Sequence, residues 1–279
     1  MSYENPQVPH EVNVSRESVL AEFVRLAIGL CLVVAVLAAT TYLLGSSLAR
    51  LVPFEVEQRL VGSRVVAPIK VAPDDADVAG VRPYLQHLTD RLAQRMDLPQ
   101  GMRPVVHWSE TDVPNAFATL GGHIVVTRGL YRRMPSENAL AMVLAHEVAH
   151  LRERDPISAV GGSATVALVL VLLGGTTDRF LPHAANAVLV GYSRRTESRA
   201  DAAAIEAVVA HYGHAGGTAA VFEVLGAYAG AARNGAPTLL STHPADEERI
   251  ARLVQRAKGW DPARQPLHPL AVPVATTDR

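Results

Sequence analysis

The segment His146-Glu147-Val148-Ala149-His150 lies within a stretch that has the apolar spacing of a helix. Residues four apart share one face of a helix with about 3.6 residues per turn. The two imidazoles can therefore reach one metal ion from the same side, while Glu147 points to a neighbouring part of that face. The pattern alone is equally compatible with two ordinary histidines on a packed helix.

The flanking residues define the ends of this helix. Ser136 is expected to be the N-cap, and Glu137 lies in the first turn, where the helix macrodipole favours a carboxylate. The helix should end near Asp155, because a residue that precedes proline disfavours the helical region and Pro156 follows. The apolar stripe between these ends consists of Leu140, Val143, Leu144 and Leu151.

A second helix is predicted from Arg194 to about Val209, and it carries two acidic residues four apart, Glu197 and Asp201. Glu197 could complete a metal site with two histidines and one glutamate. Asp201 could accept a hydrogen bond from the free ring N–H of a ligand histidine, which fixes its orientation. The alternative is a solvated charged face, in which both carboxylates pair with neighbouring arginines.

These two segments, HEVAH and ESRAD, resemble the zinc endopeptidases that include the heat-shock protease HtpX and the CAAX prenyl proteases. The resemblance spans about Val81 to Arg256, in the family's order. Three further segments carry it: Asn115 to Leu130 (NAFATLGGHIVVTRGL), Arg154-Asp155, and Ser241-Thr242-His243-Pro244 with Arg249-Ile250.

The resemblance implies a zinc endopeptidase that binds one Zn²⁺ ion and cleaves protein or peptide substrates, plausibly in protein quality control. A zinc ion held by His146, His150 and Glu197 retains a position for water and lowers the pKa of that water toward about 7. Glu147 would act as the general base and later return the proton to the leaving amine. A cysteine nucleophile is excluded, because the single cysteine, Cys31, lies in an apolar run.

Two short runs, Asn115 to Thr119 and His123 to Thr127, flank a Gly-Gly turn and predict a β-hairpin. An exposed strand can bind an extended peptide by strand addition. The resemblance favours such a substrate-binding role for Asn115, Ala116 and Phe117, and the alternative is a purely structural hairpin.

His243 precedes Pro244 and should lie in a rigid turn or at the start of a helix. Its imidazole could stabilise the oxyanion during catalysis, or it could cap the metal in a latent state. The alternative is a surface histidine.

Residues 23–49 are predicted to form one transmembrane anchor, preceded by a flexible segment, residues 1–22. No charged residue occurs from Leu26 to Ala49, a length that can cross about 30 Å of hydrocarbon. A cleavable signal peptide is the alternative, since Ser47-Leu48-Ala49 has small residues. Arginines flank both ends of the span, so the charge pattern leaves orientation open. We expect a single-pass membrane protein with a periplasmic or otherwise extracytoplasmic catalytic domain.

A second uncharged stretch runs from Ile157 to Gly175. The only segment available for a return crossing, Phe180 to Tyr192, is short and contains Pro182. A helical hairpin that packs on the domain or dips into the membrane surface is therefore expected.

The predicted fold class is α+β: a mainly helical metallopeptidase domain, residues 81–258, with a small sheet, behind the anchor. Residues 50–80 are expected to be a linker with strand character from Arg64 to Val71, and residues 259–279 a disordered tail. The net charge of −1 gives no sign of nucleic-acid binding. Other expected elements are a strand at Val105 to Trp108 and helices at Val81 to Met96, Thr218 to Arg233 and Asp246 to Lys258.

Overall fold

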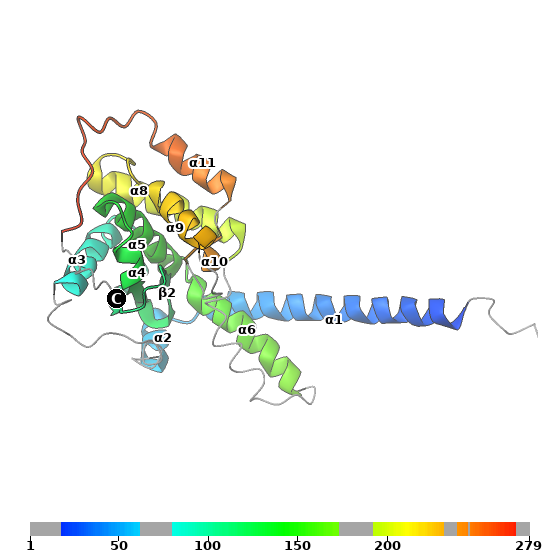
Figure 1. The fold of residues 1–279 in the computed structure, drawn as a ribbon. Coiled ribbons are helices and arrows are strands. Elements are labelled where there is room, and N and C mark those ends of the chain that lie inside the picture. The colour runs from blue at the N-terminus through cyan, green and yellow to red at the C-terminus, as the bar shows by residue number, and fades with distance from the viewer. Residues whose placement is uncertain (1–17, 62–79, 173–191, 232–238, 245, 272–279) are drawn as a thin grey trace, which may run out of the picture.

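The computed structural model describes residues 18–61, 80–172, 192–231, 239–244 and 246–271. A helical body holds a small sheet, and one long helix projects from it (Figure 1). In chain order the helices are α1 (Val19–Arg50), α2 (Phe54–Val61), α3 (Val81–Ala93), α4 (Arg128–Tyr131), α5 (Glu137–Arg152), α6 (Asp155–Leu172), α8 (Arg194–Tyr212), α9 (Ala220–Ala231), α10 (Leu239–Thr242) and α11 (Glu247–Arg256). The predicted α+β class, mainly helical behind one apolar N-terminal helix, is confirmed.

The sheet has three strands in the order β1-β3-β2. β1 (Val105–Ser109) pairs parallel with β3 (His123–Thr127), whereas β2 (Ala116–Ala118) pairs antiparallel with β3. The predicted hairpin is therefore present. Gly121 and Gly122 allow its tight turn, because both adopt positive φ angles that glycine tolerates without steric cost.

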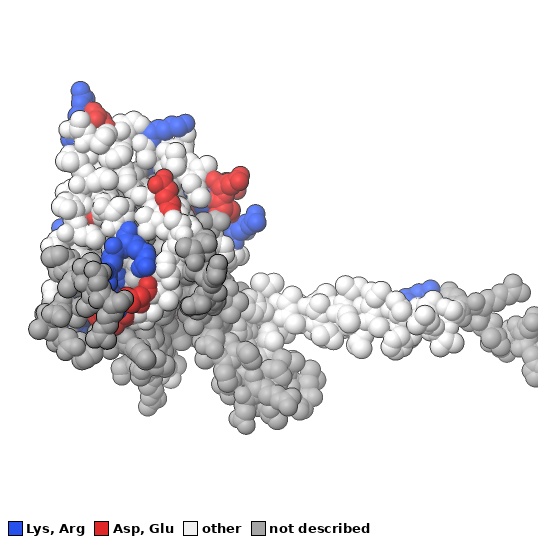
Figure 2. All heavy atoms as spheres, viewed as in Figure 1, with Lys and Arg blue, Asp and Glu red and all other residues white. Residues whose placement is uncertain are grey.

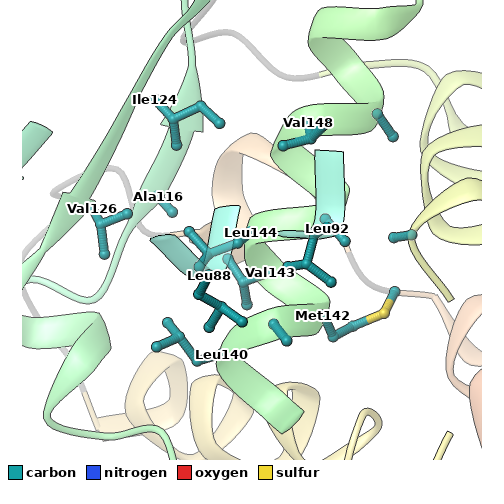
Figure 3. Close-up of a cluster of buried hydrophobic side chains, with 14 of the residues drawn as sticks. Leu88, Leu92, Ala116, Ile124, Val126, Leu140, Met142, Val143, Leu144 and Val148 are labelled. Carbon is teal, nitrogen blue, oxygen red and sulfur yellow. The ribbon is translucent and has the colours of Figure 1, made fainter. Parts of the chain in front are cut away.

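The helix α5 forms the centre of the core. It contacts β2, α3 and α8, and all of its residues from Glu137 to Leu151 are buried. Figure 3 shows side chains of α3, α5 and the sheet packed together: Leu88, Leu92, Ala116, Ile124, Val126, Leu140, Met142, Val143, Leu144 and Val148. This burial on several sides fixes the helix that carries the two histidines.

The helix α1 is long and apolar enough to cross a membrane. Its apolar span is not buried by the described part of the chain, and in Figure 2 the projecting rod is almost entirely white. An apolar helical span that no described residue buries is unfavourable in water and favourable in a bilayer. The protein is therefore membrane-associated through α1, which extends beyond the predicted 23–49 span at its N-terminal end.

The second apolar stretch forms α6, which packs mainly along the C-terminal part of α1 and also contacts α5 (Figure 1). The expectation of a helical hairpin that packs on the domain or dips into the membrane surface stays a prediction. The expected return arm of the hairpin mostly lies outside the described residues.

Part of the predicted linker is helical, since α2 occupies Phe54–Val61. Phe54 and Glu57 are buried, and Glu57 Oε1 accepts a hydrogen bond from Gly121 N at 2.6 Å. These tertiary contacts with the hairpin turn explain a helix that composition did not predict. The strand expected from Arg64 to Val71 lies outside the described residues.

The prediction of a disordered tail from Gly259 does not hold for residues 259–271. The rings of Trp260 and His214 stack at 18° with centroids 5.9 Å apart. His268 donates its backbone N–H to Asn138 Oδ1 at 2.9 Å, and its carbonyl accepts from Glu137 N at 2.8 Å. The tail thus supplies the partner for a backbone N–H in the first turn of α5, which has no partner within the helix.

Candidate metal centre

The helix α5 presents His146 and His150 on one buried face. Ser136 caps its N-terminus by accepting a hydrogen bond from Ala139 N, and Glu137 occupies the first turn, as expected. The Nε2 atoms of the two histidines lie 3.0 Å apart, so both point to the same location. The helix ends at Arg152, and Asp155 begins α6 after a short turn.

The helix α8 brings Glu197 to this location. Ser193 caps α8, and Glu197 lies in its first turn, 1% exposed. Its Oε2 lies 3.3 Å from His146 Nε2, and its Oε1 lies 3.5 Å from His150 Nε2. The alternative of a solvated charged face is therefore wrong for Glu197.

His243, directly after α10, completes a cluster of four. Its Nδ1 lies 3.1 Å from Glu197 Oε1 and 3.2 Å from His146 Nε2. One ligand atom from each of the four residues lies within 4.8 Å of the others. A tetrahedral zinc ion with bonds of about 2.0–2.1 Å places its ligand atoms about 3.3 Å apart. The observed separations fit such an ion, and the donor set is the set that zinc prefers.

Each histidine of α5 is also held from behind by a carboxylate. His146 Nδ1 lies 3.0 Å from Asp201 Oδ1. His150 Nδ1 lies 3.0 Å from Asp155 Oδ2. With the proton fixed on Nδ1, Nε2 presents its lone pair to the metal position in both rings.

Arg249 of α11 neutralises the acidic side of the cluster. It donates to both oxygens of Asp201, at 2.6 and 2.9 Å, and lies 2.9 Å from Glu197 Oε2. Burial alone would raise the pKa of Asp201, but hydrogen bonds from Arg249 and His146 lower that pKa to about 2. Both carboxylates are therefore ionised at neutral pH.

The carboxylates around the cluster favour protonated imidazoles on α5. Burial tends to lower the pKa of His146, but the carboxylates of Asp201 and Glu197 outweigh it and raise that pKa to about 10. The pKa of Glu197 is lowered in turn, against the effect of burial, by its hydrogen bonds to the histidines. A bound cation would take the place of these protons.

Glu147 lies beside the cluster of four without being part of it. Its Oε2 accepts a hydrogen bond from the backbone N–H of Ala118 at 2.7 Å. Its Oε1 is buried, makes no hydrogen bond within the described residues, and lies 3.6 Å from His243 Nε2. A buried carboxylate oxygen without a hydrogen-bond donor is energetically costly. A water molecule beside Oε1 could supply the missing donor.

A small cavity adjoins the cluster, with a volume of about 30 Å³. This is room for one or two water molecules but not for a peptide side chain. Its lining is mainly apolar and includes Met142, Val143, Phe222, Leu225 and Leu240 beside the polar cluster.

The structure places the three proposed substrate-binding residues at and next to an edge strand. β2 contains Ala116 and Phe117, and Asn115 directly precedes it. Asn115 and Ala116 are buried, whereas Phe117 is partly exposed. Asn115 N donates to Thr127 Oγ1 at 2.9 Å, which fixes its backbone against β3.

Residues 81–257 match the model of peptidase family M48. The chain belongs to peptidase family M48. It is 32% identical over 212 residues to the protease HtpX homolog of Salinibacter ruber, covering 63% of this chain and 75% of that relative. It is also 29% identical over 212 residues to the protease HtpX homolog of Gemmatimonas aurantiaca, covering 61% and 75%. Family and ligand geometry agree that this is a zinc metallopeptidase.

Three residues of this M48 peptidase site had no role assigned from sequence. Asp155 and Arg249 lie in segments that carry the family resemblance, and this was the only indication in the sequence that they belong to the site. Tyr192 stacks on the ring of His150 at 22°, with centroids 4.3 Å apart. Nothing in the local pattern around Tyr192 indicated this contact, which depends on tertiary packing.

Proposed function

We propose that this M48 peptidase is a membrane-anchored zinc endopeptidase in which His146, His150 and Glu197 hold the catalytic ion. The observation that carries the proposal is the convergence of their Nε2, Nε2 and carboxylate atoms at 3.0 to 3.5 Å. Bound there, zinc would supply Lewis acidity for both an attacking water and the substrate carbonyl. Asp201 and Asp155 keep the two rings oriented for this role.

Glu147 is the proposed general base. Its Oε1 faces the cluster without a hydrogen-bond donor, so it can accept the proton of an attacking water. The same oxygen can then deliver that proton to the leaving amine. Its other oxygen is held by Ala118 N, which fixes the carboxylate during both transfers.

The edge of β2 is the proposed substrate track. Ala118 donates to Glu147 across this edge, so the strand lies directly beside the general base. A peptide added along β2 would pass over the ligand cluster with its scissile carbonyl near the metal. In this arrangement Asn115 contacts the peptide backbone, and Ala116 and Phe117 line the track.

We assign His243 primarily to a latent state. Its Nδ1 lies among the ligand atoms, where it would supply a fourth protein ligand. Zinc sites with four protein ligands are typically structural, whereas catalytic sites keep one position for water. Departure of His243 would open that position, and the displaced ring could then stabilise the oxyanion.

The biological role we propose is quality control of misfolded or membrane-near proteins, with the catalytic domain on the extracytoplasmic side. The HtpX-type relatives and the exposed anchor support this role. Protease digestion of intact spheroplasts tests the orientation: cleavage of the domain without lysis agrees, and full protection contradicts it. A zinc-binding module with little proteolysis is the alternative, and it would tolerate loss of Glu147.

Zinc content of the full-length protein tests the ligand assignment. Wild type should hold one zinc per chain, and His146→Ala and Glu197→Ala should lose it. His87→Ala is the matched control, because His87 is an exposed histidine of α3. Stoichiometric zinc in His146→Ala would overturn the assignment.

A further inference from the structure

We infer that the membrane anchor is part of the scaffold of the zinc site, with Arg50 acting as a positioning residue for the ligand His150. Arg50 is the last residue of α1 and Asp155 is the first residue of α6. The inference rests on the proposed function, since it takes His150 as a metal ligand. It assigns to α1 a role beyond attachment to the bilayer.

One carboxylate connects the anchor to the ligand. Arg50 Nη2 donates to Asp155 Oδ1 at 3.2 Å, and Asp155 Oδ2 pairs with His150 Nδ1 at 3.0 Å. Asp155 is only 2% exposed, so its rotation is restricted by these two contacts and by packing. A shift of the end of α1 would therefore turn the carboxylate that orients the His150 ring.

The backbones of α1 and α6 lie in direct contact where two glycines face each other. A Cβ atom at Gly45 would lie 2.2 Å from Thr165 Oγ1 and 2.7 Å from the Gly161 carbonyl oxygen. A Cβ atom at Gly161 would lie 2.3 Å from the Cβ of Ala49. Such contact leaves no room for a side chain at either glycine. The place where α1 crosses α6 therefore fixes the position of the start of α6, and with it the position of Asp155 (Figure 1).

The segment that follows α1 also contacts the turn between α5 and α6. Arg154 Nη1 pairs with Glu57 at 2.6 Å, and Arg154 Nη2 donates to the Val52 carbonyl at 2.5 Å. Arg154 has a φ of 60°, an unfavourable conformation for a residue with a side chain. Two consecutive residues that follow the second histidine, Arg154 and Asp155, thus both contact the chain between Arg50 and Glu57.

A second arginine lies near Asp155, but farther away. Arg199 Nη2 of α8 is 3.9 Å from Asp155 Oδ1, whereas Arg50 is 3.2 Å from the same atom. Both arginine side chains are 43% exposed, so neither ion pair is strong by charge alone. We therefore expect Arg50 to act through hydrogen-bond geometry, with a smaller contribution from Arg199.

A matched pair of glycines in α1 makes the test specific. Gly45 lies at the crossing, whereas Gly29 has no atom within 4 Å of the position a Cβ would take. Gly45→Leu should separate the helices, and Gly29→Leu makes the same chemical change on the same apolar helix. Arg50→Gln removes the guanidinium and leaves only a shorter amide whose nitrogen lies two bonds closer to the backbone, so it no longer reaches Asp155. Arg50→Lys keeps the charge and an N–H donor of similar reach, and Arg59→Gln removes an exposed arginine of α2.

The first measurement is the zinc dissociation constant of the full-length protein in nanodiscs, determined by competition with a chelator. The second is the visible absorption spectrum of the same protein with Co²⁺ in place of zinc. Loss of a residue that orients a ligand weakens metal binding by about 10- to 100-fold. We expect weakening of at least several-fold and altered Co²⁺ bands in Gly45→Leu and Arg50→Gln. Arg50→Lys should retain most of the affinity, and Gly29→Leu and Arg59→Gln should match wild type.

Unchanged zinc affinity and Co²⁺ spectrum in Arg50→Gln and Gly45→Leu, with zinc bound to wild type, would overturn the inference alone. If Gly45→Leu failed to fold, Arg50→Gln against Arg50→Lys would decide by the same criteria. Absence of zinc from wild type would instead overturn the proposed function, and the inference with it.

Discussion

His243 Nδ1 lies 3.1 Å from Glu197 Oε1, inside the set of atoms that would surround a zinc ion. A catalytic zinc site needs a position for water, and in the described conformation a histidine is placed there. The small adjoining cavity, with a volume of about 30 Å³, has room for water next to this histidine. Our proposal of a latent state therefore requires His243 to move before substrate binds.

Replacement of His243 by alanine should open the site. We expect zinc to remain bound through three ligands with about tenfold weaker affinity, in the range for loss of one contact near a metal. Basal cleavage of an unstructured substrate such as casein should rise. The measurement is zinc affinity and initial cleavage rate, with His87→Ala as the control. A fall in cleavage with unchanged zinc affinity would show that His243 serves the oxyanion instead.

The zinc-stripped protein should be less stable at pH 10 than at pH 7. The carboxylates of Asp201 and Glu197 raise the folded-state pKa of His146 to about 10, above the ordinary value of 6.5 for a histidine. Its stabilising contribution is therefore fully present below pH 6.5 and is lost as pH rises through 10. Thermal unfolding of the stripped protein should show this decline. The zinc-loaded protein should show less of it, because the bound ring carries no exchangeable proton at Nε2.

Zinc binding near pH 7 should release protons, since the metal binds the neutral imidazole of His146. Calorimetric titration in two buffers with different ionisation enthalpies measures the number released. We expect the histidines of α5 to release at least about one proton for each zinc ion that binds. Binding without proton release would contradict the raised pKa.

Glu137 should matter for stability rather than for catalysis. It accepts hydrogen bonds from Tyr84 at 2.6 Å and Tyr212 at 2.8 Å, and so joins α3, α5 and α8. Glu137→Ala would leave both half-buried hydroxyls without this acceptor, and we expect a loss toward the lower end of the roughly 1–3 kcal/mol that an unpaired buried group costs. Thermal unfolding should show the loss, while zinc affinity stays unchanged, because Glu137 lies nine residues before His146 on α5.

Glu206→Ala is the matched control for Glu137, since Glu206 is an exposed residue of α8 paired with Arg256. A surface pair of this kind contributes at most about 1 kcal/mol. Equal effects of the two substitutions on unfolding would refute a special role for Glu137.

Local patterns predicted the helix with the two histidines, the helix with Glu197 and the hairpin. Each depends on features that act within a few residues: an N-cap at Ser136, the four-residue spacing of Glu197 and Asp201, and a Gly-Gly turn that includes Gly121. The four-residue spacing also placed Asp201 on the same helix face as Glu197, because helical geometry fixes that relation.

Contacts between distant segments were not predictable in the same way. Asp155 reaches His150 only because Arg154 turns the chain at positive φ between two helices. The helix α2 and residues 259–271 are ordered by contacts with Gly121, His214 and Asn138, which lie far away in sequence. Their own composition, mixed in one case and rich in proline in the other, carries no sign of these partners.

The most direct test of the account compares Glu147→Gln with wild type, both as full-length protein in detergent micelles, for zinc content and casein cleavage. We predict one zinc per chain in both proteins. Cleavage should be nearly abolished in Glu147→Gln, because the amide cannot accept the proton of water. Comparable cleavage by both proteins would contradict Glu147 as the general base.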